Sequence, residues 1–264
     1  MDGVGNLMIQ LSKRLQTVAN YITEGNKVAD IGSDHALLPV YLVQSAKCPS
    51  AIAGELNEGP WQAARKQIAN AGLTAKIDAR RGNGLAILEQ NEVDTVTICG
   101  MGGVLMSDIL EAGLLAGQLE GVKELVLQPN VGEDTVRSWL VRHEWALIDE
   151  KIIEEDGKIY EVLYAIKSVD AQQHNKQLFS STHMTLPLSD TMNKAMMFKM
   201  GPHLLPKRDK VLLKKWKSEL QKLDYIINSL QLSTLDSAKA KLEATEKEKN
   251  HISEVLEWLF TDKQ

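Results

Sequence analysis

The sequence has 264 residues, a formal net charge of −5 and 44% hydrophobic residues, enough for one large α/β domain and a smaller appendage. Its two cysteines exclude a small disulfide-stabilised scaffold and favour a reducing compartment. The first ten residues lack the basic and apolar regions of a secretory signal, and no stretch approaches the ~18 apolar residues of a membrane span, so we expect a soluble, cytoplasmic protein.

The first part of the chain alternates short β-rich runs with amphipathic stretches. Apolar residues between Met8 and Ile22 follow helical spacing, and residues 60–73 form a second helical segment with a proline in its first turn. Strands are predicted at residues 27–31, 50–55, 75–80, 94–99 and 124–127. This alternation predicts a parallel sheet covered by helices on both faces.

An antiparallel hairpin is predicted to close this sheet. After a helix at residues 133–143, the β-rich runs 146–155 and 158–166 are joined by Asp156-Gly157, a dipeptide that favours a type I′ turn. A parallel sheet closed in this way is the strand plan of class I methyltransferases, whereas a dehydrogenase would continue with parallel βα units. We therefore predict an α/β fold with a Rossmann-like, seven-stranded mixed sheet.

We place the boundary of this methyltransferase domain at residue 167 and predict a helical domain for residues 168–264. Residues 168–200 are polar and methionine-rich and predict a linker that enters an irregular or short helical segment. Apolar rows with alternating spacings of 3 and 4, at residues 213–230 and 242–259, predict a coiled-coil-like antiparallel helical hairpin.

The first predicted strand ends in a loop that contains one glycine and precedes a helix N-terminus. Gly32 alone does not make a G-x-G-x-x-G phosphate loop, so a nicotinamide dinucleotide is disfavoured. Asp30, two residues before the glycine, instead resembles the first methyltransferase motif, whose loop holds the amino-acid moiety of S-adenosylmethionine. The alternative is that Asp34 and His35 only cap the following helix or are polar loop residues.

The next three strand ends carry residues that suit a nucleoside. Glu55 ends the second strand, where a carboxylate can accept hydrogen bonds from both ribose hydroxyls; an ordinary exposed acid is the alternative. Asn83 follows the third strand, where methyltransferases contact adenine; a turn residue with positive φ is the alternative. Gly100, Gly102 and Gly103 follow the fourth strand and either clear space for a flat substrate or serve only as turn glycines.

Seven short motifs follow one another along the chain: Ser12-Lys-Arg-Leu15, Asp30-Ile-Gly-Ser-Asp-His-Ala36, Gly54-Glu-Leu-Asn57, Gly82-Asn-Gly-Leu85, Ile98-Cys-Gly-Met-Gly-Gly103, Leu127-Gln-Pro-Asn130 and Glu155-Asp-Gly-Lys-Ile-Tyr160. Their order resembles the TrmK family of bacterial tRNA (adenine-N1)-methyltransferases, which modify the adenine at tRNA position 22. The resemblance spans essentially the whole chain, and the fifth and sixth motifs are its most distinctive pair.

This resemblance implies S-adenosylmethionine as methyl donor and a C-terminal helical domain that helps to hold tRNA. The donor-binding residues it implies are Asp30, Gly32, Asp34, His35, Glu55, Leu56, Asn83, Gly84, Gly100 and Met101. We hypothesise that the catalytic pocket is shaped by Asp34, His35, Gly102, Gly103, Gln128 and Asn130, with the first two at the methionine end of the donor. No metal is expected.

The chemistry of the residues favours attack by a ring nitrogen. Adenine N1 has an in-plane lone pair and can displace the sulfonium methyl group directly, so no covalent enzyme intermediate is needed. Neither Cys48 nor Cys99 has the Pro-Cys order of cytosine C5 methylation, and the Asn/Asp-Pro-Pro-aromatic loop of exocyclic N6 enzymes is absent. Because neutral N1 needs no deprotonation, His35 is disfavoured as a general base.

Basic residues for tRNA are unevenly distributed. Residues 1–167 carry 15 Lys and Arg against 23 Asp and Glu, and residues 168–264 carry 15 against 12, so an acidic core adjoins a mildly basic appendage. The candidates are Lys13, Arg14, Arg81 and a row of Lys207, Lys210, Lys214 and Lys217. The spacing of the row predicts one basic helical face; a solvated flank of the coiled coil is equally open.

Three other functions stay open at this point. The chain could methylate a small molecule or a protein and use the hairpin for dimerisation, or be an NAD-dependent oxidoreductase, or be a non-enzymatic RNA-binding adaptor. The missing phosphate loop and the closing hairpin argue against the oxidoreductase. The oligomeric state stays open, and a monomer is compatible with the sequence.

Overall fold

The computed structural model describes residues 8–232 and 236–261, and the chain divides into two compact units between Gln172 and Gln173. The β-sheet belongs to the first unit, and the second is helical. Of the helices within the described ranges, none combines the length and apolar composition needed to span a bilayer.

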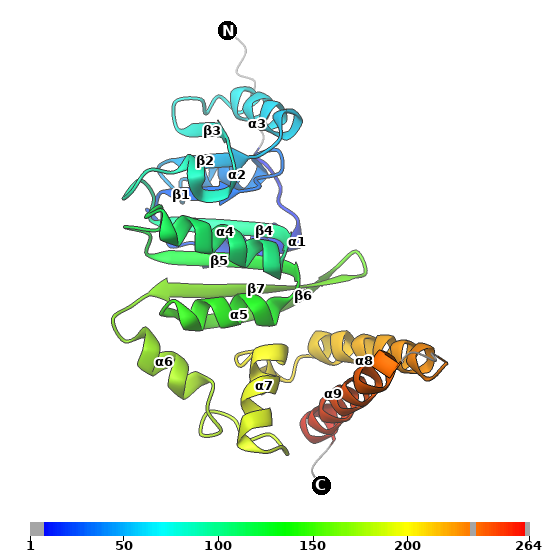
Figure 1. The fold of residues 1–264 in the computed structure, drawn as a ribbon. Coiled ribbons are helices and arrows are strands. Elements are labelled where there is room, and N and C mark those ends of the chain that lie inside the picture. Colours follow the sequence, from blue (N-terminus) through cyan, green and yellow to red (C-terminus); the bar gives the residue numbers. More distant parts are fainter. Residues whose placement is uncertain (1–7, 233–235, 262–264) are drawn as a thin grey trace. The chain divides into compact units, whose positions relative to one another are not determined.

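The first unit is built on a seven-stranded sheet with the strand order β3-β2-β1-β4-β5-β7-β6 (Figure 1). The first five strands are parallel, and β7 runs antiparallel to both β5 and β6. The strands are β1 (Val28–Ile31), β2 (Ala51–Glu55), β3 (Ile77–Arg81), β4 (Thr95–Gly102), β5 (Glu124–Val131), β6 (Trp145–Glu155) and β7 (Lys158–Lys167). The predicted mixed sheet is confirmed.

The closing hairpin has the predicted turn. Asp156 and Gly157 join β6 to β7, and their φ angles are +50° and +74°. Two consecutive positive φ angles are what a type I′ turn requires, and its twist matches that of the flanking strands. The Asp-Gly dipeptide therefore sets the register in which β6 and β7 pair.

Helices cover both faces of the sheet (Figure 1). They are α1 (Lys13–Tyr21), α2 (Leu37–Gln44), α3 (Glu58–Asn70), the 3-10 helix η1 (Gly84–Ile87), α4 (Gly103–Leu115) and α5 (Glu133–Arg142). Val18 of α1 and Leu38 and Leu42 of α2 pack in one buried cluster with Val126 and Val162 of the sheet. α4 and α5 lie together over the other face.

Two strands continue beyond their predicted ends. β4 was expected to end at Cys99 and β5 at Leu127, but their pairing continues to Gly102 and Val131. The ladder is interrupted by register shifts on both sides of Met101, and Gly100 has a φ of +77° that accommodates the irregularity. The prediction that the glycines follow the strand is therefore wrong for Gly100 and Gly102, because they form its irregular end, whereas Gly103 begins α4.

The second unit consists of packed helices. They are α6 (Ala171–Leu178), which belongs to this unit from Gln173 onward, α7 (Asp190–Met200), the 3-10 helix η2 (Leu205–Lys207), α8 (Lys210–Gln231) and α9 (Asp236–Phe260). The segment predicted as a linker is thus more helical than predicted, since it contains both α6 and α7. Its methionines Met196, Met197 and Met200 are buried. The hairpin of α8 and α9 is present, and Lys249 Nζ lies 2.5 Å from Asp224 Oδ1 across it.

A buried charged cluster fastens α5 to the closing hairpin. Arg137 of α5 donates a hydrogen bond of 2.6 Å to Glu150 of β6 and another to Glu161 of β7, and none of the three side chains is exposed. Burial alone would lower the pKa of Arg137, but the two carboxylates outweigh burial and raise it. The guanidinium group of Arg137 therefore stays charged despite its burial.

Removing this cation should destabilise the first unit. We expect Arg137→Met to lower the free energy of unfolding by about 3–5 kcal/mol at neutral pH, because two buried carboxylates lose their counter-ion. Urea denaturation measures it, with Arg142→Met on the exposed end of α5 as control. Equal stability of the two variants would contradict the prediction.

Candidate active site at the carboxyl edge of the sheet

A pocket of about 380 Å³ lies at the carboxyl ends of β1, β4 and β5. β1 and β4 are neighbours in the sheet, although the chain visits β2 and β3 between them. Helices that leave such a point toward opposite faces open a crevice, where α/β proteins bind their ligands. The lining residues are Arg14, Leu15, Asp30, Gly32, Ser33, Asp34, Cys99, Gly100, Met101, Asn130 and Tyr160.

Asp30 is the buried acid of this pocket. Its Oδ1 accepts a hydrogen bond of 2.6 Å from Thr97 Oγ1 on β4, and its Oδ2 accepts one of 2.6 Å from Ser33 Oγ. Burial raises the pKa of the Asp30 carboxyl above its ordinary value, while the two hydroxyl hydrogen bonds act in the opposite direction. The carboxyl group is thus held at a fixed place beside the crevice.

The loop after β1 takes an unusual backbone path. Gly32 has a φ of +71°, and Asp34, His35 and Ala36 follow with φ angles of +41°, +63° and +56°. Positive φ at residues other than glycine costs about 1–3 kcal/mol each and is typical of functional sites. An added Cβ at Gly32 would lie 2.3 Å from the Met101 methyl carbon, so this flexible side chain would have to move, and the positive φ itself favours glycine.

Asp34 and His35 do not cap the following helix. The N-cap of α2 is Ala36, and no side chain accepts a hydrogen bond from the first turn. The capping alternative is therefore wrong. Both side chains are instead largely exposed and lie beside one another, with 3.7 Å between His35 Nε2 and Asp34 Oδ1. Asp34 lines the pocket, whereas His35 is outside the lining.

Glu55 is tied to this loop from the end of β2. Its Oε1 accepts a hydrogen bond of 2.7 Å from the backbone N–H of Asp34. Glu55 is 9% exposed, so the alternative of an ordinary exposed acid is wrong, and burial raises the pKa of its carboxyl. The side chain of the next residue, Leu56, is 57% exposed and offers an apolar surface next to it.

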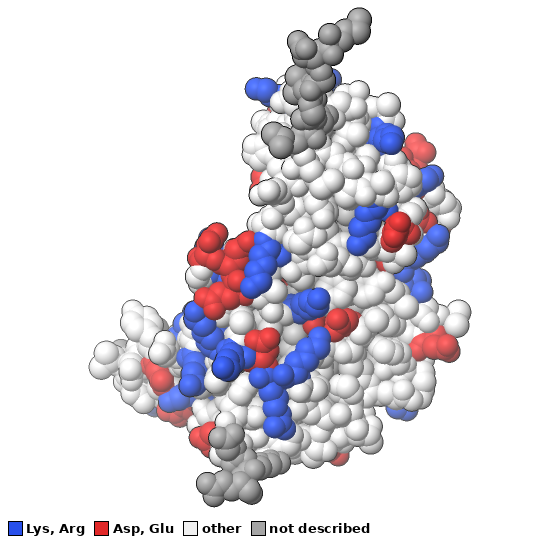
Figure 2. Space-filling model, turned by 180° about the vertical axis from the view of Figure 1, so that it is seen from behind, with Lys and Arg blue, Asp and Glu red and all other residues white. Residues whose placement is uncertain are grey.

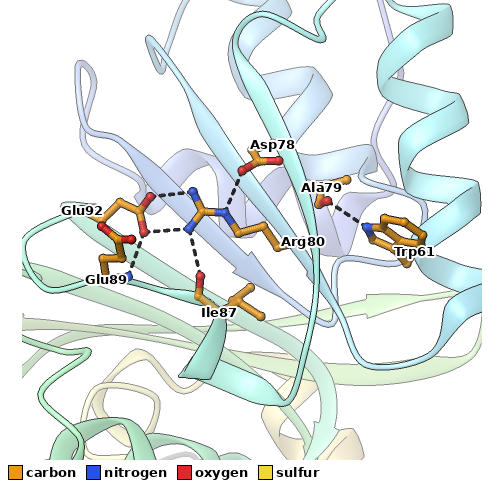
Figure 3. A network of polar contacts seen from close by, with 7 residues as sticks. All are labelled: Trp61, Asp78, Ala79, Arg80, Ile87, Glu89 and Glu92. Carbon is orange, nitrogen blue, oxygen red and sulfur yellow. Dashed lines mark hydrogen bonds and ion pairs between the residues drawn. The ribbon is translucent and has the colours of Figure 1, made fainter.

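Asn83 and Gly84 follow β3 and lie between Arg80 and its partners Ile87 and Glu92 in the chain. Figure 3 shows the contacts of Arg80. Arg80 donates to both carboxylate oxygens of Glu92, at 2.8 and 2.6 Å, and to the carbonyl oxygen of Ile87 at 2.9 Å. Asn83 is exposed, and its φ is −91°, so it is not a positive-φ turn residue. The network fixes both ends of the turn that carries Asn83.

The opposite side of the pocket is held by a chain of hydrogen bonds. Arg14 donates to Gln128 Oε1 at 2.7 Å, Gln128 Nε2 donates to Asn130 Oδ1 at 3.2 Å, and Asn130 Nδ2 donates to the Gly100 carbonyl at 2.7 Å. Gln128 is fully buried, so it positions the pocket wall from behind. Asn130 is the exposed member of the chain.

Arg14 was expected on the RNA-contacting surface, but its side chain lines the pocket. Its guanidinium carbon lies 5.5 Å from the centre of the Tyr160 ring. Glu155 at the end of β6 accepts hydrogen bonds from the backbone N–H groups of Lys13 and Arg14 and thereby caps α1. Tyr160 and Glu155 were present in the seventh motif, but the sequence assigned them no role.

Other predicted RNA contacts are partly engaged within the protein. Lys13 Nζ donates to the Glu154 carbonyl at 3.1 Å, and Arg81 lies 2.5 Å from Glu58. Figure 2 shows acidic side chains gathered at the projecting tip of the β6–β7 hairpin, where Glu154 and Glu155 lie. This tip is an unfavourable surface for phosphate.

The lysine row is shorter than predicted. Lys207 ends η2, and the break after it is set by Arg208 at a φ of +49° and by Asp209, which accepts a hydrogen bond from the N–H of Val211 and caps α8. A continuous helical row of four lysines is therefore wrong. The three others, Lys210, Lys214 and Lys217, line one groove along α8 together with Leu213, Ser218 and Gln221.

The three glycines of the fifth motif, Gly100, Gly102 and Gly103, have different roles. Gly100 lines the pocket at positive φ. An added Cβ at Gly103 would lie 2.0 Å from the Gly132 carbonyl oxygen, so this glycine is needed for backbone packing. Gly102 has an ordinary φ of −71°, and its nearest neighbour would be a Val131 methyl group at 3.9 Å. Neither Gly102 nor Gly103 lines the pocket.

The described residues contain no group of three or more His, Cys, Asp or Glu side chains arranged to hold a metal ion. Of the predicted site residues, the pocket brings together Arg14, Asp30, Gly32, Asp34, Gly100, Met101 and Asn130. Glu55 and Gln128 touch this set through hydrogen bonds. The pocket thus combines the carboxyl groups of Asp30 and Asp34 with the side-chain amide of Asn130, which Gln128 supports from behind.

Comparison with known proteins finds relatives along nearly the whole chain. Residues 28–257 match the model of the TrmK family, tRNA (adenine(22)-N(1))-methyltransferase. The tRNA (adenine(22)-N(1))-methyltransferase of Bacillus subtilis is 41% identical over 250 residues, covering 94% of this chain and 98% of that protein. The crystal structure of Bacillus subtilis TrmK has a TM-score of 0.82 at 40% identity, with 94% and 99% coverage. A Streptococcus pneumoniae protein solved in complex with S-adenosyl-L-methionine has a TM-score of 0.76 at 36% identity, with 94% and 100% coverage.

The neighbouring glycines allow a matched test of the pocket edge. We expect Gly103→Ala to lower the free energy of unfolding by about 1–3 kcal/mol, because the added methyl group forces the ends of β4 and β5 apart. Gly102→Ala should change it by less than about 0.5 kcal/mol, since the methyl group has room. Urea denaturation of both variants measures the difference, and equal stability would contradict it.

Proposed function

This chain belongs to the TrmK family of tRNA (adenine(22)-N(1))-methyltransferases, and we propose that it transfers a methyl group from S-adenosylmethionine to N1 of adenine 22 in the D-loop region of tRNA. The observation that carries the proposal is the pocket at the reversal of strand order, with Asp30 on one wall and Asn130 on the other. Its size is in the range of small-molecule sites.

The residues present fit the donor. Gly32 leaves the cradle that a Cβ would fill, and the pocket is lined by the buried Asp30 of β1 and by Asp34 of the adjacent loop. These carboxylates suit the amino group and the positive sulfur of S-adenosylmethionine. A carboxylate has about four acceptor positions, so Glu55 can accept from ribose hydroxyls while it holds the Asp34 amide. Leu56 and Asn83 would flank the adenine ring of the donor.

When bound, S-adenosylmethionine supplies a methyl carbon attached to a positively charged sulfur. The work of the protein is alignment, and well-oriented reactants can gain about 7–11 kcal/mol. Asn130 is fixed by Gln128 and by the Gly100 carbonyl, so its exposed amide can orient a base at the pocket mouth. Gln128 and Arg14 act as positioning residues, since they hold Asn130 and the wall behind it.

No side chain in the pocket is required as a nucleophile or a base. Cys99 lines the pocket, but burial raises the pKa of its thiol, which disfavours the reactive thiolate. His35 is outside the pocket lining, and N1 of neutral adenine attacks without losing a proton. The positive charge that the ring gains is offset by the acidic wall formed by Asp30 and Asp34.

For the tRNA backbone we propose contacts from Lys210, Lys214 and Lys217 on α8, with Lys207 nearby in the chain. The three lysines line one groove and are exposed. Their unit carries a formal charge of opposite sign to the acidic catalytic unit, which favours phosphate binding there. A tRNA substrate also supports the expected location in the cytoplasm.

Position-resolved methylation tests the function. We expect the purified chain, incubated with unmodified tRNA carrying adenine 22 and labelled S-adenosylmethionine, to yield 1-methyladenosine at that position, seen by nuclease digestion and mass spectrometry. A tRNA with guanine 22 is the substrate control, and Asp30→Asn should weaken donor binding by more than about tenfold. A methyl group on N6, on a pyrimidine or at another position would contradict the proposal.

Salt dependence tests the lysines. Replacing Lys207, Lys210, Lys214 and Lys217 with Gln should weaken tRNA binding and flatten its dependence on salt by ~0.7–0.9 log units per decade for each lost phosphate contact. Lys222→Gln with Lys247→Gln is the matched control, since these lysines pair with Glu219 and Glu243. Unchanged affinity and slope in the fourfold variant would assign the row to a solvated flank.

A further inference from the structure

Three large apolar side chains are exposed together at the carboxyl ends of β4 and β5. Val104 is 64% exposed, Leu105 54% and Val131 67%, and we call these three residues the apolar rim. Single exposed apolar residues are normal on a protein surface, but several on neighbouring segments point to an interaction site. None of the three is used by the packing of the sheet or by the pocket lining described above.

The backbone brings the rim residues to one edge. Gly102 pairs with Val131 across the β4–β5 ladder, and the first residue of α4, Gly103, touches the backbone of Gly132. Val104 and Leu105 follow directly in the first turn of α4. The two short segments therefore leave the sheet side by side, with their apolar side chains toward solvent.

This rim stands next to the pocket wall in the chain. Met101 and Asn130 line the pocket, and each stands within three residues of a rim residue in the chain. A molecule that enters over this wall thus passes from an apolar surface to the Asn130 amide. The rim has no hydrogen-bonding side chain, so it can pack against any base without reading its identity.

We propose that the apolar rim packs against the RNA bases next to the target adenine and holds the gap that this adenine leaves when it enters the pocket. The inference rests on the proposed function, because it deepens the handling of that same substrate. The N1 atom lies on the pairing edge of adenine, so the base must leave its pair and its stack to react. Apolar side chains that take the place of a base are a common way to stabilise such a distorted nucleic acid.

The rim therefore acts on structured RNA and not on the donor. It should matter most when the adenine starts from a paired and stacked position, and least when the adenine is already unpaired. An interface between two copies of the chain is the alternative use of the same surface. A direct comparison of two RNA substrates separates these possibilities.

The variant for the test is V104T/L105Q/V131T, which keeps similar side-chain sizes and removes the apolar character. Leu115→Gln is the matched control, since Leu115 is 79% exposed at the other end of α4. The substrates are tRNA with adenine 22 and the same tRNA with an abasic site opposite that adenine. Single-turnover methylation, donor affinity by calorimetry, and oligomeric state by analytical ultracentrifugation are measured for each protein.

We expect the rim variant to methylate the intact tRNA at least tenfold more slowly than the wild type and the abasic-site tRNA less than twofold more slowly. Donor affinity should be unchanged in the variant, and Leu115→Gln should match the wild type throughout. An equal loss on both substrates, no loss on intact tRNA, or a dimer that the rim variant dissociates would overturn the inference. A wild-type protein that methylates neither RNA would overturn the proposed function and the inference with it.

Discussion

The hydrogen bond from Thr97 to Asp30 joins the two halves of the sheet at the place where the strand order reverses. The two residues occupy paired positions on β4 and β1, so the carboxyl group is fixed by the ladder itself. A buried acid is costly unless hydrogen bonds compensate it, and Thr97 and Ser33 supply them. The glycine cradle, the left-handed loop and Glu55 are all arranged around this point.

The pocket has two walls that are stabilised in different ways. The acidic wall belongs to β1 and to the loop that follows it, and it is held by hydrogen bonds such as the one from the Asp34 N–H to Glu55. The amide wall depends on Arg14, which comes from α1 and is held by Gln128 and the Tyr160 ring. The two walls of one crevice therefore depend on different parts of the chain.

Periodicity and turn chemistry predicted the strands, the closing hairpin and the helical C-terminal region, because these depend on local patterns of apolar residues. The positions of Asp30 and Glu55 were predictable as well, because each stands at the end of a strand that these patterns predict. Three features were not: the bulged extension of β4, the inward direction of Arg14, and the helix break after Lys207. Each depends on a backbone angle or on a partner far along the chain, such as Glu155, which caps α1. The periodicity of apolar residues carries no information about backbone angles or distant partners.

The cap that Glu155 places on α1 links residues separated by 142 positions in the chain. The five parallel strands end at Val131, so a growing chain can complete the acidic wall before the hairpin leaves the ribosome. Arg14 reaches its final place only after Tyr160 has been made. The order of synthesis thus allows the acidic wall of the crevice to form before the amide wall, which needs the last two strands of the sheet.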